Sequence, residues 1–127
     1  MRFMSELIYP DISYKLNGVL FSVHNKLGQF RSEKEYGDLI ESYFKKLNIN
    51  YEREKVLPSS FDNDQKRNRV DFLVEDKIIL ELKAKRFIDK EDYYQMKRYL
   101  LSLNKPLGIL VNFRRKYITP KRIVNFS

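Results

Sequence analysis

The stretch from Arg69 to Lys85, RVDFLVEDKIILELKAK, constrains most strongly what this chain can fold into. Two apolar runs, Val70–Val74 and Ile78–Ala84, flank a polar tripeptide, a pattern that predicts a β-hairpin. Side chains alternate between the faces of a strand, so Glu81 and Lys83 share one face. Charged groups on an otherwise apolar strand are costly to bury unless they are paired or bind a metal ion. The hairpin therefore predicts both a sheet and a polar site within it.

The site has a third member, Asp71, on the first strand of the same hairpin. Carboxylates on adjacent strands, here Asp71 and Glu81, can hold a hard divalent cation, which prefers oxygen ligands. Such a cation lowers the pKa of water and stabilises charge on a phosphate. Lys83 can orient or deprotonate the attacking water. These three residues are a minimal set for phosphodiester hydrolysis, and the alternative is a cross-strand salt bridge on a solvated sheet face.

Two helices are expected before the hairpin. Apolar residues at helical spacing predict the first over Ile12–Leu27, with Asp11 able to cap its start. The second is expected over Glu33–Leu47, where Ser32 and Glu35 have the spacing of a capping box.

The remaining elements complete an α/β pattern of α-α-β-β-β-α-β-(β), a mixed sheet with helices on its faces. A charged, partly exposed strand is expected before the hairpin, and a polar loop joins the two. A helix capped by Asp89, a buried strand and a short final strand follow. The expected bounds are Asn50–Leu57 for the charged strand, Pro58–Asn68 for the loop, Lys90–Leu103 for the helix, Leu107–Phe113 for the buried strand and Arg122–Phe126 for the last.

Glu33 lies near the apolar stripe of the second expected helix. At about 100° per residue, it shares a face with Tyr36, Ile40, Phe44 and Leu47, so the sequence predicts an acid on the buried side. An acid on an apolar face favours a functional role. The alternative is an N-terminal acid that interacts favourably with the helix dipole.

Gln95 and Tyr99 form an i, i+4 pair beside the apolar stripe of the third expected helix. Both side chains can hydrogen-bond a phosphate or a catalytic group. The alternative is a surface glutamine beside a half-buried tyrosine.

The triplet Glu81-Leu82-Lys83, preceded by Val70-Asp71, resembles the signature of the PD-(D/E)XK nuclease superfamily. The segment Gln95–Tyr99 resembles the QxxxY motif of its RecB-type exonuclease branch. More closely, the chain resembles the small GxxExxY proteins of that superfamily, from the first helix to Val124. It departs from their pattern at Phe30, which stands where glycine is expected, and at Val70, which stands where the superfamily name has proline.

The resemblance implies a restriction-endonuclease-like core (αβββαβ) with an extra N-terminal helix. It also implies a role for each site residue. Asp71, Glu81 and the carbonyl of Leu82 would be metal ligands, with Mg²⁺ or Mn²⁺ as the cofactor. Lys83 would serve the nucleophilic water. Glu33 would complete the acidic cluster, and Gln95 and Tyr99 would position the substrate or Lys83.

The net charge of +8 and the pI of about 9.6 favour a polyanionic partner, and nucleic acid is the commonest one. The residues expected to bind it are cations in the polar loop, after the hairpin and near the C-terminus. They are Arg69, Lys85, Arg114, Arg115 and Lys116, with Tyr117 available to stack on a base. A solvated turn is the alternative for the C-terminal cluster.

Composition excludes several other classes of protein. The chain has no cysteine and one histidine, which rules out disulfides, cysteine nucleophiles and a multi-histidine zinc site. No apolar run approaches the roughly 20 residues of a membrane span, and no signal peptide begins the chain. A single cytoplasmic domain over residues 1–127 is expected.

The leading hypothesis is a Mg²⁺-dependent nuclease that acts on DNA, in preference to RNA. The alternatives are a catalytically silent module of the same fold that binds nucleic acid or a protein partner, and a role in RNA processing or as a scaffold. Surplus aromatic residues also predict a homodimer paired through the first helix. They are Phe3, Tyr9, Tyr14, Phe21, Tyr93, Tyr94 and Phe126.

Overall fold

A computed structural model describes residues 8–58 and 68–125. Within these residues, two helices come first, followed by three strands, a third helix and two strands, as the sequence predicts. Their bounds are α2 Pro10–Leu27, α3 Glu33–Lys46, β1 Tyr51–Val56, β2 Arg69–Val74, β3 Ile78–Lys83, α4 Lys90–Leu103, β4 Leu107–Asn112 and β5 Lys121–Val124.

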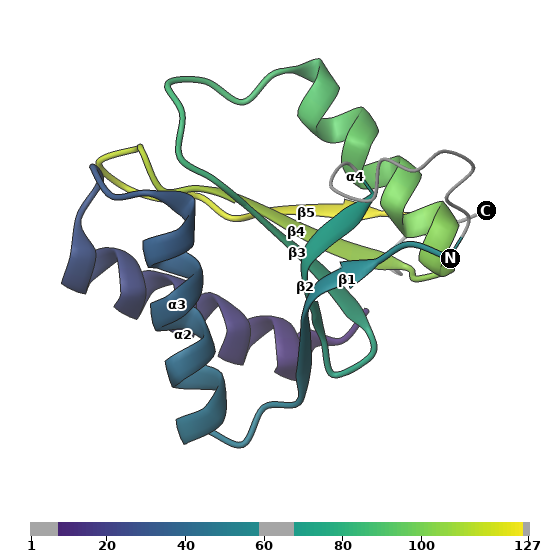
Figure 1. Ribbon diagram of the computed structural model, residues 1–127, viewed down its shortest axis with the longest axis horizontal. Helices are drawn as coiled ribbons and strands as arrows, with labels where there is room; N and C mark the ends of the chain where they lie inside the picture. Colours follow the sequence, from purple (N-terminus) through teal and green to yellow (C-terminus); the bar gives the residue numbers. More distant parts are fainter. Residues whose placement is uncertain (1–7, 59–67, 126–127) are drawn as a thin grey trace.

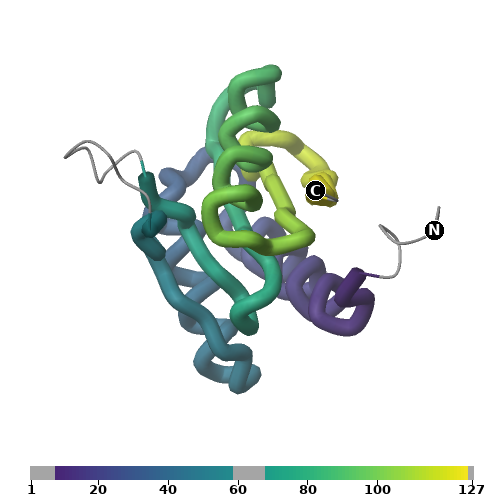
Figure 2. The backbone as a smooth tube through the Cα atoms, turned by 90° about the vertical axis from the view of Figure 1, so that its right-hand side faces the viewer, coloured from purple at the N-terminus to yellow at the C-terminus, as the bar shows by residue number. Residues whose placement is uncertain are grey.

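The strands form one mixed sheet in the order β1-β2-β3-β4-β5. β1, β2 and β3 are antiparallel neighbours, β4 lies parallel to β3, and β5 pairs antiparallel with β4. The parallel step is made by α4, which crosses one face of the sheet, while α2 and α3 cover the other (Figures 1 and 2). The α/β architecture with an additional N-terminal helix is therefore confirmed.

Each face of the sheet has its own apolar core. Ile78, Leu80 and Leu82 of β3 pack with the buried faces of α2 and α3. Ile79, between them in sequence, packs instead with α4, in a cluster that contains Tyr99. This alternation confirms the predicted strand parity, and it directs Glu81 and Lys83 toward the α4 face.

The capping predictions hold for two helices and fail for the first. Ser32 and Asp89 both form capping boxes, at α3 and α4. At α2 the N-cap is Tyr9 and Asp11 lies inside the first turn, so the predicted Asp11 cap is wrong. Pro10 explains the earlier start, because its fixed φ and missing N–H suit the first position of a helix.

The hairpin between β2 and β3 turns where the sequence places it. Glu75 and Asp76 both have positive φ, 53° and 55°, and the N–H of Lys77 donates to the carbonyl of Val74. Residues 59–67 of the predicted polar loop lie outside the described residues, as do Phe3 and Phe126.

In the part of the chain that the structure describes, no helix is long and apolar enough to cross a membrane.

Candidate functional site

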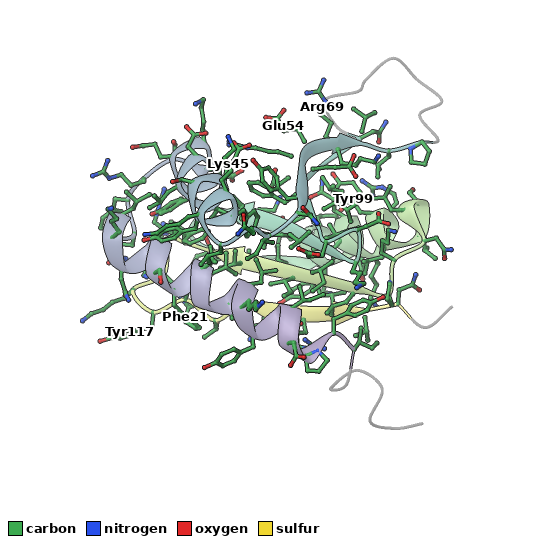
Figure 3. The ribbon with its side chains drawn as sticks, turned by 90° about the horizontal axis from the view of Figure 1, so that it is seen from below. Phe21, Lys45, Glu54, Arg69, Tyr99 and Tyr117 are labelled. Atoms are coloured by element: carbon green, nitrogen blue, oxygen red, sulfur yellow. The ribbon has the colours of Figure 1, made fainter. Side chains whose placement is uncertain are left out.

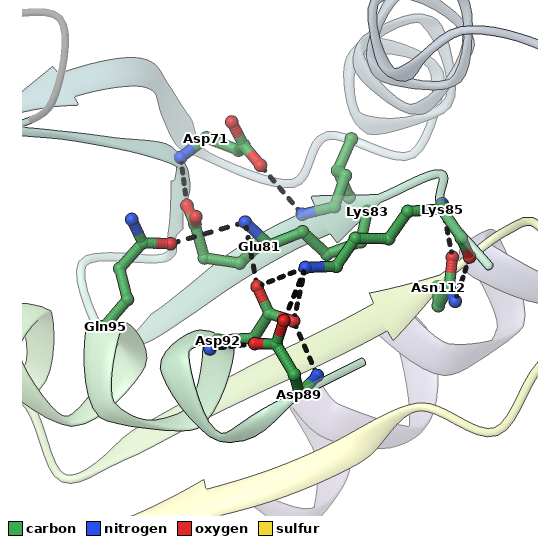
Figure 4. A network of polar contacts seen from close by, with 9 residues as sticks. Asp71, Glu81, Lys83, Lys85, Asp89, Asp92, Gln95 and Asn112 are labelled. Carbon is green, nitrogen blue, oxygen red and sulfur yellow. Dashed lines mark hydrogen bonds and ion pairs between the residues drawn. The ribbon is translucent and has the colours of Figure 1, made fainter. Parts of the chain in front are cut away.

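The pairing of β2 with β3 gives way to side-chain contacts at the acidic residues. The paired residues run from Val74 opposite Ile78 to Phe72 opposite Leu80. One residue further, the N–H of Asp71 donates to Oε2 of Glu81 at 2.6 Å. The N–H of Leu82 donates to Oδ2 of Asp71 at 2.7 Å (Figure 4). Two carboxylates thus stand where the ladder between two central strands would continue.

Both carboxyl groups resist ionisation. Burial, helped by the charge of Glu33, raises the pKa of Asp71 to about 6 against the hydrogen bond from the Leu82 N–H, which lowers it. Glu81 is 5% exposed, and its pKa is raised well above the usual range by burial and by the charge of Asp71. A pair of acids that repel each other in a low-dielectric site is suited to bind a cation, which favours the charged form of both.

As metal ligands, the carboxylates of Asp71 and Glu81 fit a hard divalent cation. The backbone N–H groups of Asp71 and Leu82 bond one oxygen of each carboxylate, Oε2 of Glu81 and Oδ2 of Asp71. Carboxylate oxygens are the ligands that Mg²⁺ and Mn²⁺ prefer. No group of three or more acidic, histidine or cysteine residues that could hold a metal occurs among residues 8–58 and 68–125. In that part of the chain, the candidate side-chain metal ligands at the ladder break are the pair Asp71 and Glu81.

Lys83 lies on the same side of β3 as Glu81 and reaches α4. Its Nζ donates to Oε1 of Gln95 at 3.3 Å and lies 3.7 Å from Oδ1 of Asp92 (Figure 4). The positive charge of Lys83 favours the charged forms of both Asp71 and Glu81. The structure thus brings Asp71, Glu81, Lys83 and Gln95 together.

Tyr99 lies one turn beyond Gln95 on α4 and is buried, not half-buried as the alternative interpretation had it. Burial raises the pKa of Tyr99 to about 12, the charges of Glu81 and Asp71 act in the same direction, and a hydrogen bond with the Gln95 side chain lowers it. The phenol therefore keeps its proton and borders the acidic pair. Lys83, Gln95 and Tyr99 are joined through the amide of Gln95.

Asp92 is a member of this site that was not predicted. Its carboxylate is buried, accepts from Lys85 Nζ at 2.7 Å and caps α4 through the backbone of Asp89. Burial opposes its charge, but the hydrogen bonds from Lys85 and Asp89 hold the pKa of Asp92 below its usual range. One signal was present, because Asp92 lies one helical turn before Gln95 and therefore on the same face of α4.

On the α3 side, Asp71 opens into a pocket of about 600 Å³. Glu33, Glu54 and Arg69 line it together with Leu82. Glu54 was not predicted. It has a φ of 56° in the middle of β1, and its carboxylate accepts from Arg69 Nη1 at 3.1 Å (Figure 3). A bend of this kind in a charged edge strand leaves no sequence signal.

The expectation that Glu33 lies on the buried side of its helix is wrong, since Glu33 is exposed. Leu47, at the other end of the predicted stripe, is 53% exposed. The middle of the stripe is correct, because Tyr36, Ile40 and Phe44 are fully buried. A helical projection gives the direction of a side chain but not how far the sheet extends along the helix. Glu33 precedes the part of α3 that the sheet covers. Its side chain lines the pocket of Asp71, where it is exposed to solvent.

The cations expected to contact nucleic acid fall in three places. Arg69 borders the acidic pocket. Arg114, Arg115 and Lys116 lie in the connection from β4 to β5, where Arg114 Nη2 donates to the carbonyl of Ala84 at 3.2 Å. Lys85 lies in the connection from β3 to α4. Its Nζ forms an ion pair with Asp92 and lies 3.8 Å from Oδ2 of Asp89.

A comparison with family models identifies the chain. A model described as the PD-(D/E)XK nuclease superfamily matches residues 10–123. The chain belongs to this superfamily. No curated protein and no solved structure matches the chain significantly.

Membership in the PD-(D/E)XK nuclease superfamily supports hydrolase activity and a nucleic-acid substrate. The nucleases of this superfamily generally use Mg²⁺ or Mn²⁺. The family match extends from the first turn of α2 to β5, so it includes the ladder break, the acidic pocket and the α4 residues described above.

Proposed function

We propose that this chain is a Mg²⁺-dependent nuclease that hydrolyses phosphodiester bonds in DNA. One observation carries the proposal: the buried carboxylates of Asp71 and Glu81 meet at the break in the β2–β3 ladder, with Lys83 beside them. A salt bridge on a solvated sheet face, the structural alternative, does not account for a pair of acids whose pKa values are both raised.

Each residue has a proposed role. Asp71 and Glu81 hold the cation, with the Leu82 carbonyl as a further ligand, and Glu33 adds negative charge from the pocket. When bound, the divalent cation neutralises charge on the phosphate and lowers the pKa of water. Lys83 orients the attacking water and offsets the negative charge that develops on the phosphate.

The α4 residues are proposed to keep Lys83 in place. Gln95 accepts a hydrogen bond from its ammonium group, and Asp92, one turn earlier on α4, attracts the same group. Gln95 contacts both Lys83 and Tyr99, and these two contacts support assignment of the chain to the QxxxY pattern of RecB-type exonucleases. The same contacts, together with Glu33 and Tyr36 at the start of α3, support assignment to the GxxExxY subgroup.

The test is cleavage of labelled single- and double-stranded DNA and RNA by the purified protein with Mg²⁺, Mn²⁺ or EDTA. Asp71→Asn and Glu81→Gln should lose activity. Asp76→Asn is the matched control, because Asp76 is an exposed acid at the opposite end of the same hairpin. Failure to cut any of the four substrates with either metal would contradict the proposal.

One observation favours a second candidate, a silent module that binds nucleic acid or a protein partner. The two acids replace ladder hydrogen bonds, and the described residues contain no third acid close enough to form a metal cluster with them. A purely structural role would satisfy this geometry. The effect of Asp71→Asn on the stability of the metal-free protein separates the two candidates.

The homodimer remains a prediction. Tyr14 and Phe21, on α2, are exposed, which is what pairing through this helix requires. Tyr9 and Tyr93 instead pack partly against the two cores and offer less surface. Light scattering at micromolar concentration measures the mass, and a monomer would remove the support for pairing.

A further inference from the structure

Three exposed aromatic residues, each beside a cation, lie in the connections at one end of the sheet. Arg114 lies 5.8 Å from the ring centroid of Phe30, Arg86 lies 5.5 Å from that of Phe87, and Lys116 lies 5.5 Å from that of Tyr117. The rings are 76%, 72% and 75% exposed. We call these six side chains the aromatic rim.

The three connections of the rim are tied together. They are the α2–α3, β3–α4 and β4–β5 connections, which meet on the left of Figure 1. Gln29 donates to the carbonyl of Arg114 at 2.9 Å, and Arg114 donates to that of Ala84. The side chain of Asn112 bonds both the N–H and the carbonyl of Lys85, at 3.1 and 2.7 Å. The backbone that carries the rings is therefore held in place before any ligand arrives.

The rim adjoins, along the chain, the two elements that carry Lys83 and Glu33. Phe30 is three residues before Glu33, which borders the pocket of Asp71, and Phe87 is four residues after Lys83. The rim therefore flanks the end of β3 that carries Lys83 and the start of α3 that carries Glu33.

The chemistry of the rim selects unpaired bases. A phenyl ring exposed by three quarters contributes little to the core, and in duplex DNA the faces of the bases are covered by stacking. A base that is free to unstack can lie on such a ring, while the neighbouring arginine meets the phosphate. Resting on the proposed function, we propose that the aromatic rim binds single-stranded DNA and directs it into the acidic site, so that single strands are the substrate of this nuclease.

The test is fluorescence anisotropy of the full chain with labelled oligonucleotides in EDTA, so that no strand is cut. The probes are a single-stranded DNA of about 12 nucleotides, its duplex and the RNA of the same sequence. The single-stranded DNA is expected to bind more tightly than the other two. Tighter binding of the duplex would overturn the proposal, and tighter binding of RNA would overturn its assignment to DNA.

Variants identify the rings as the cause. Phe30→Ala and Phe87→Ala should each weaken single-strand binding by about fivefold or more, because a stacked base contributes roughly 1–3 kcal/mol. Their salt dependence should stay unchanged, whereas Arg86→Gln should reduce the slope of affinity against salt. Leu101→Ala is the matched control, an apolar side chain that is 61% exposed in the last turn of α4, away from the rim. Phe variants that bind as Leu101→Ala does would overturn the proposal.

Two further measurements keep the outcome clear. Phe30→Trp and Phe87→Trp retain a stacking surface and should bind as the wild type does, so loss of affinity in them as well would count against stacking. The same wild-type sample is assayed for cleavage with Mg²⁺. Single-strand binding without cleavage would contradict the proposed nuclease activity but not the assignment of the rim. Cleavage without a preference for binding single strands would contradict the assignment of the rim but not the nuclease activity.

Discussion

Lys83 and Asp92 face each other across the gap between β3 and α4, with 3.7 Å between Nζ and Oδ1. The same carboxylate holds Lys85 at 2.7 Å, so one buried acid fixes the positions of two lysines. Gln95 accepts from Lys83 but carries no charge. Asp92 is therefore the side chain that draws the ammonium group toward α4.

We predict that Asp92→Asn lowers the cleavage rate about tenfold while leaving KM nearly unchanged. The amide keeps the shape and the capping bond but not the charge that positions Lys83, and outer partners of this kind contribute about 10- to 100-fold. Asp89→Asn is the control, since Asp89 is an exposed acid that also approaches Lys85. A shift in the pH profile of the rate would accompany a positioning role. A lower melting temperature with an unchanged rate would show that Asp92 is only structural.

Lys83→Met should lower single-turnover cleavage at least about 100-fold, the usual size of a lost acid–base or charge-stabilising group. Binding of uncut DNA in EDTA should change little, because Lys83 is largely buried and Arg69, Arg114 and Lys116 remain. Lys105→Met is the control, at the far end of α4 and paired with Asp76. Equal losses of rate in the two variants would argue against a catalytic role for Lys83.

The fold was predictable because its signals are local and repeated. The hairpin, the buried β4, the capping box of α3 and the Asp89 cap of α4 each follow from residues close together in the sequence, and each lies within one or two residues of its expected bounds. The start of α2 was not predicted, because Asp11 is a good cap by type while Pro10 determines where the helix begins.

The site was predictable where strand parity decides it and not where two distant elements meet. Asp71, Glu81 and Lys83 follow from the alternation of one hairpin. Glu54 reaches the pocket through a positive φ in β1, and Asp92 contacts Lys83 only because α4 packs on β3. No local pattern encodes either contact.

Asp71→Asn and Glu81→Gln should each leave the melting temperature of the metal-free protein unchanged or raise it, while abolishing cleavage. Each substitution removes one of two buried charges that repel each other, so this repulsion no longer destabilises the folded state. Thermal melting followed by circular dichroism measures this, with Asp76→Asn as the reference. Should both variants melt far below the wild type, the acids would be structural and the silent module would be favoured.

The stability of the metal-free protein should fall as the pH rises from about 4 to about 7. The pKa of Asp71 is about 6 in the folded chain against 3.8 for the ordinary group, so the folded state binds more protons between these values. Its stabilising contribution is complete below the unfolded pKa and is lost as the pH passes the folded pKa, a change of up to about 3 kcal/mol. Glu81, whose pKa is also raised, acts in the same direction and extends the window upward. Urea unfolding in EDTA at a series of pH values measures the slope of the free energy of unfolding against pH. Asp71→Asn should flatten this slope. An equally steep slope in that variant would show that other groups cause the pH dependence.

Mg²⁺ should stabilise the protein, and more so at pH 8 than at pH 5.5. A ligand at 100 times its dissociation constant adds about 2.7 kcal/mol to the free energy of unfolding, which corresponds to several degrees in a domain of this size. At the lower pH Asp71 and Glu81 hold protons that compete with the cation, so binding must release them. Asp71→Asn should lose the shift, and Asp76→Asn should keep it, because Asp76 lies at the turn of the hairpin, away from the acidic pair. Thermal melting over a titration of MgCl₂ at both pH values decides this without any nuclease substrate. A shift of the same size in Asp71→Asn would place the cation elsewhere on the molecule, and no shift at either pH in the wild type would remove the metal from the proposed site.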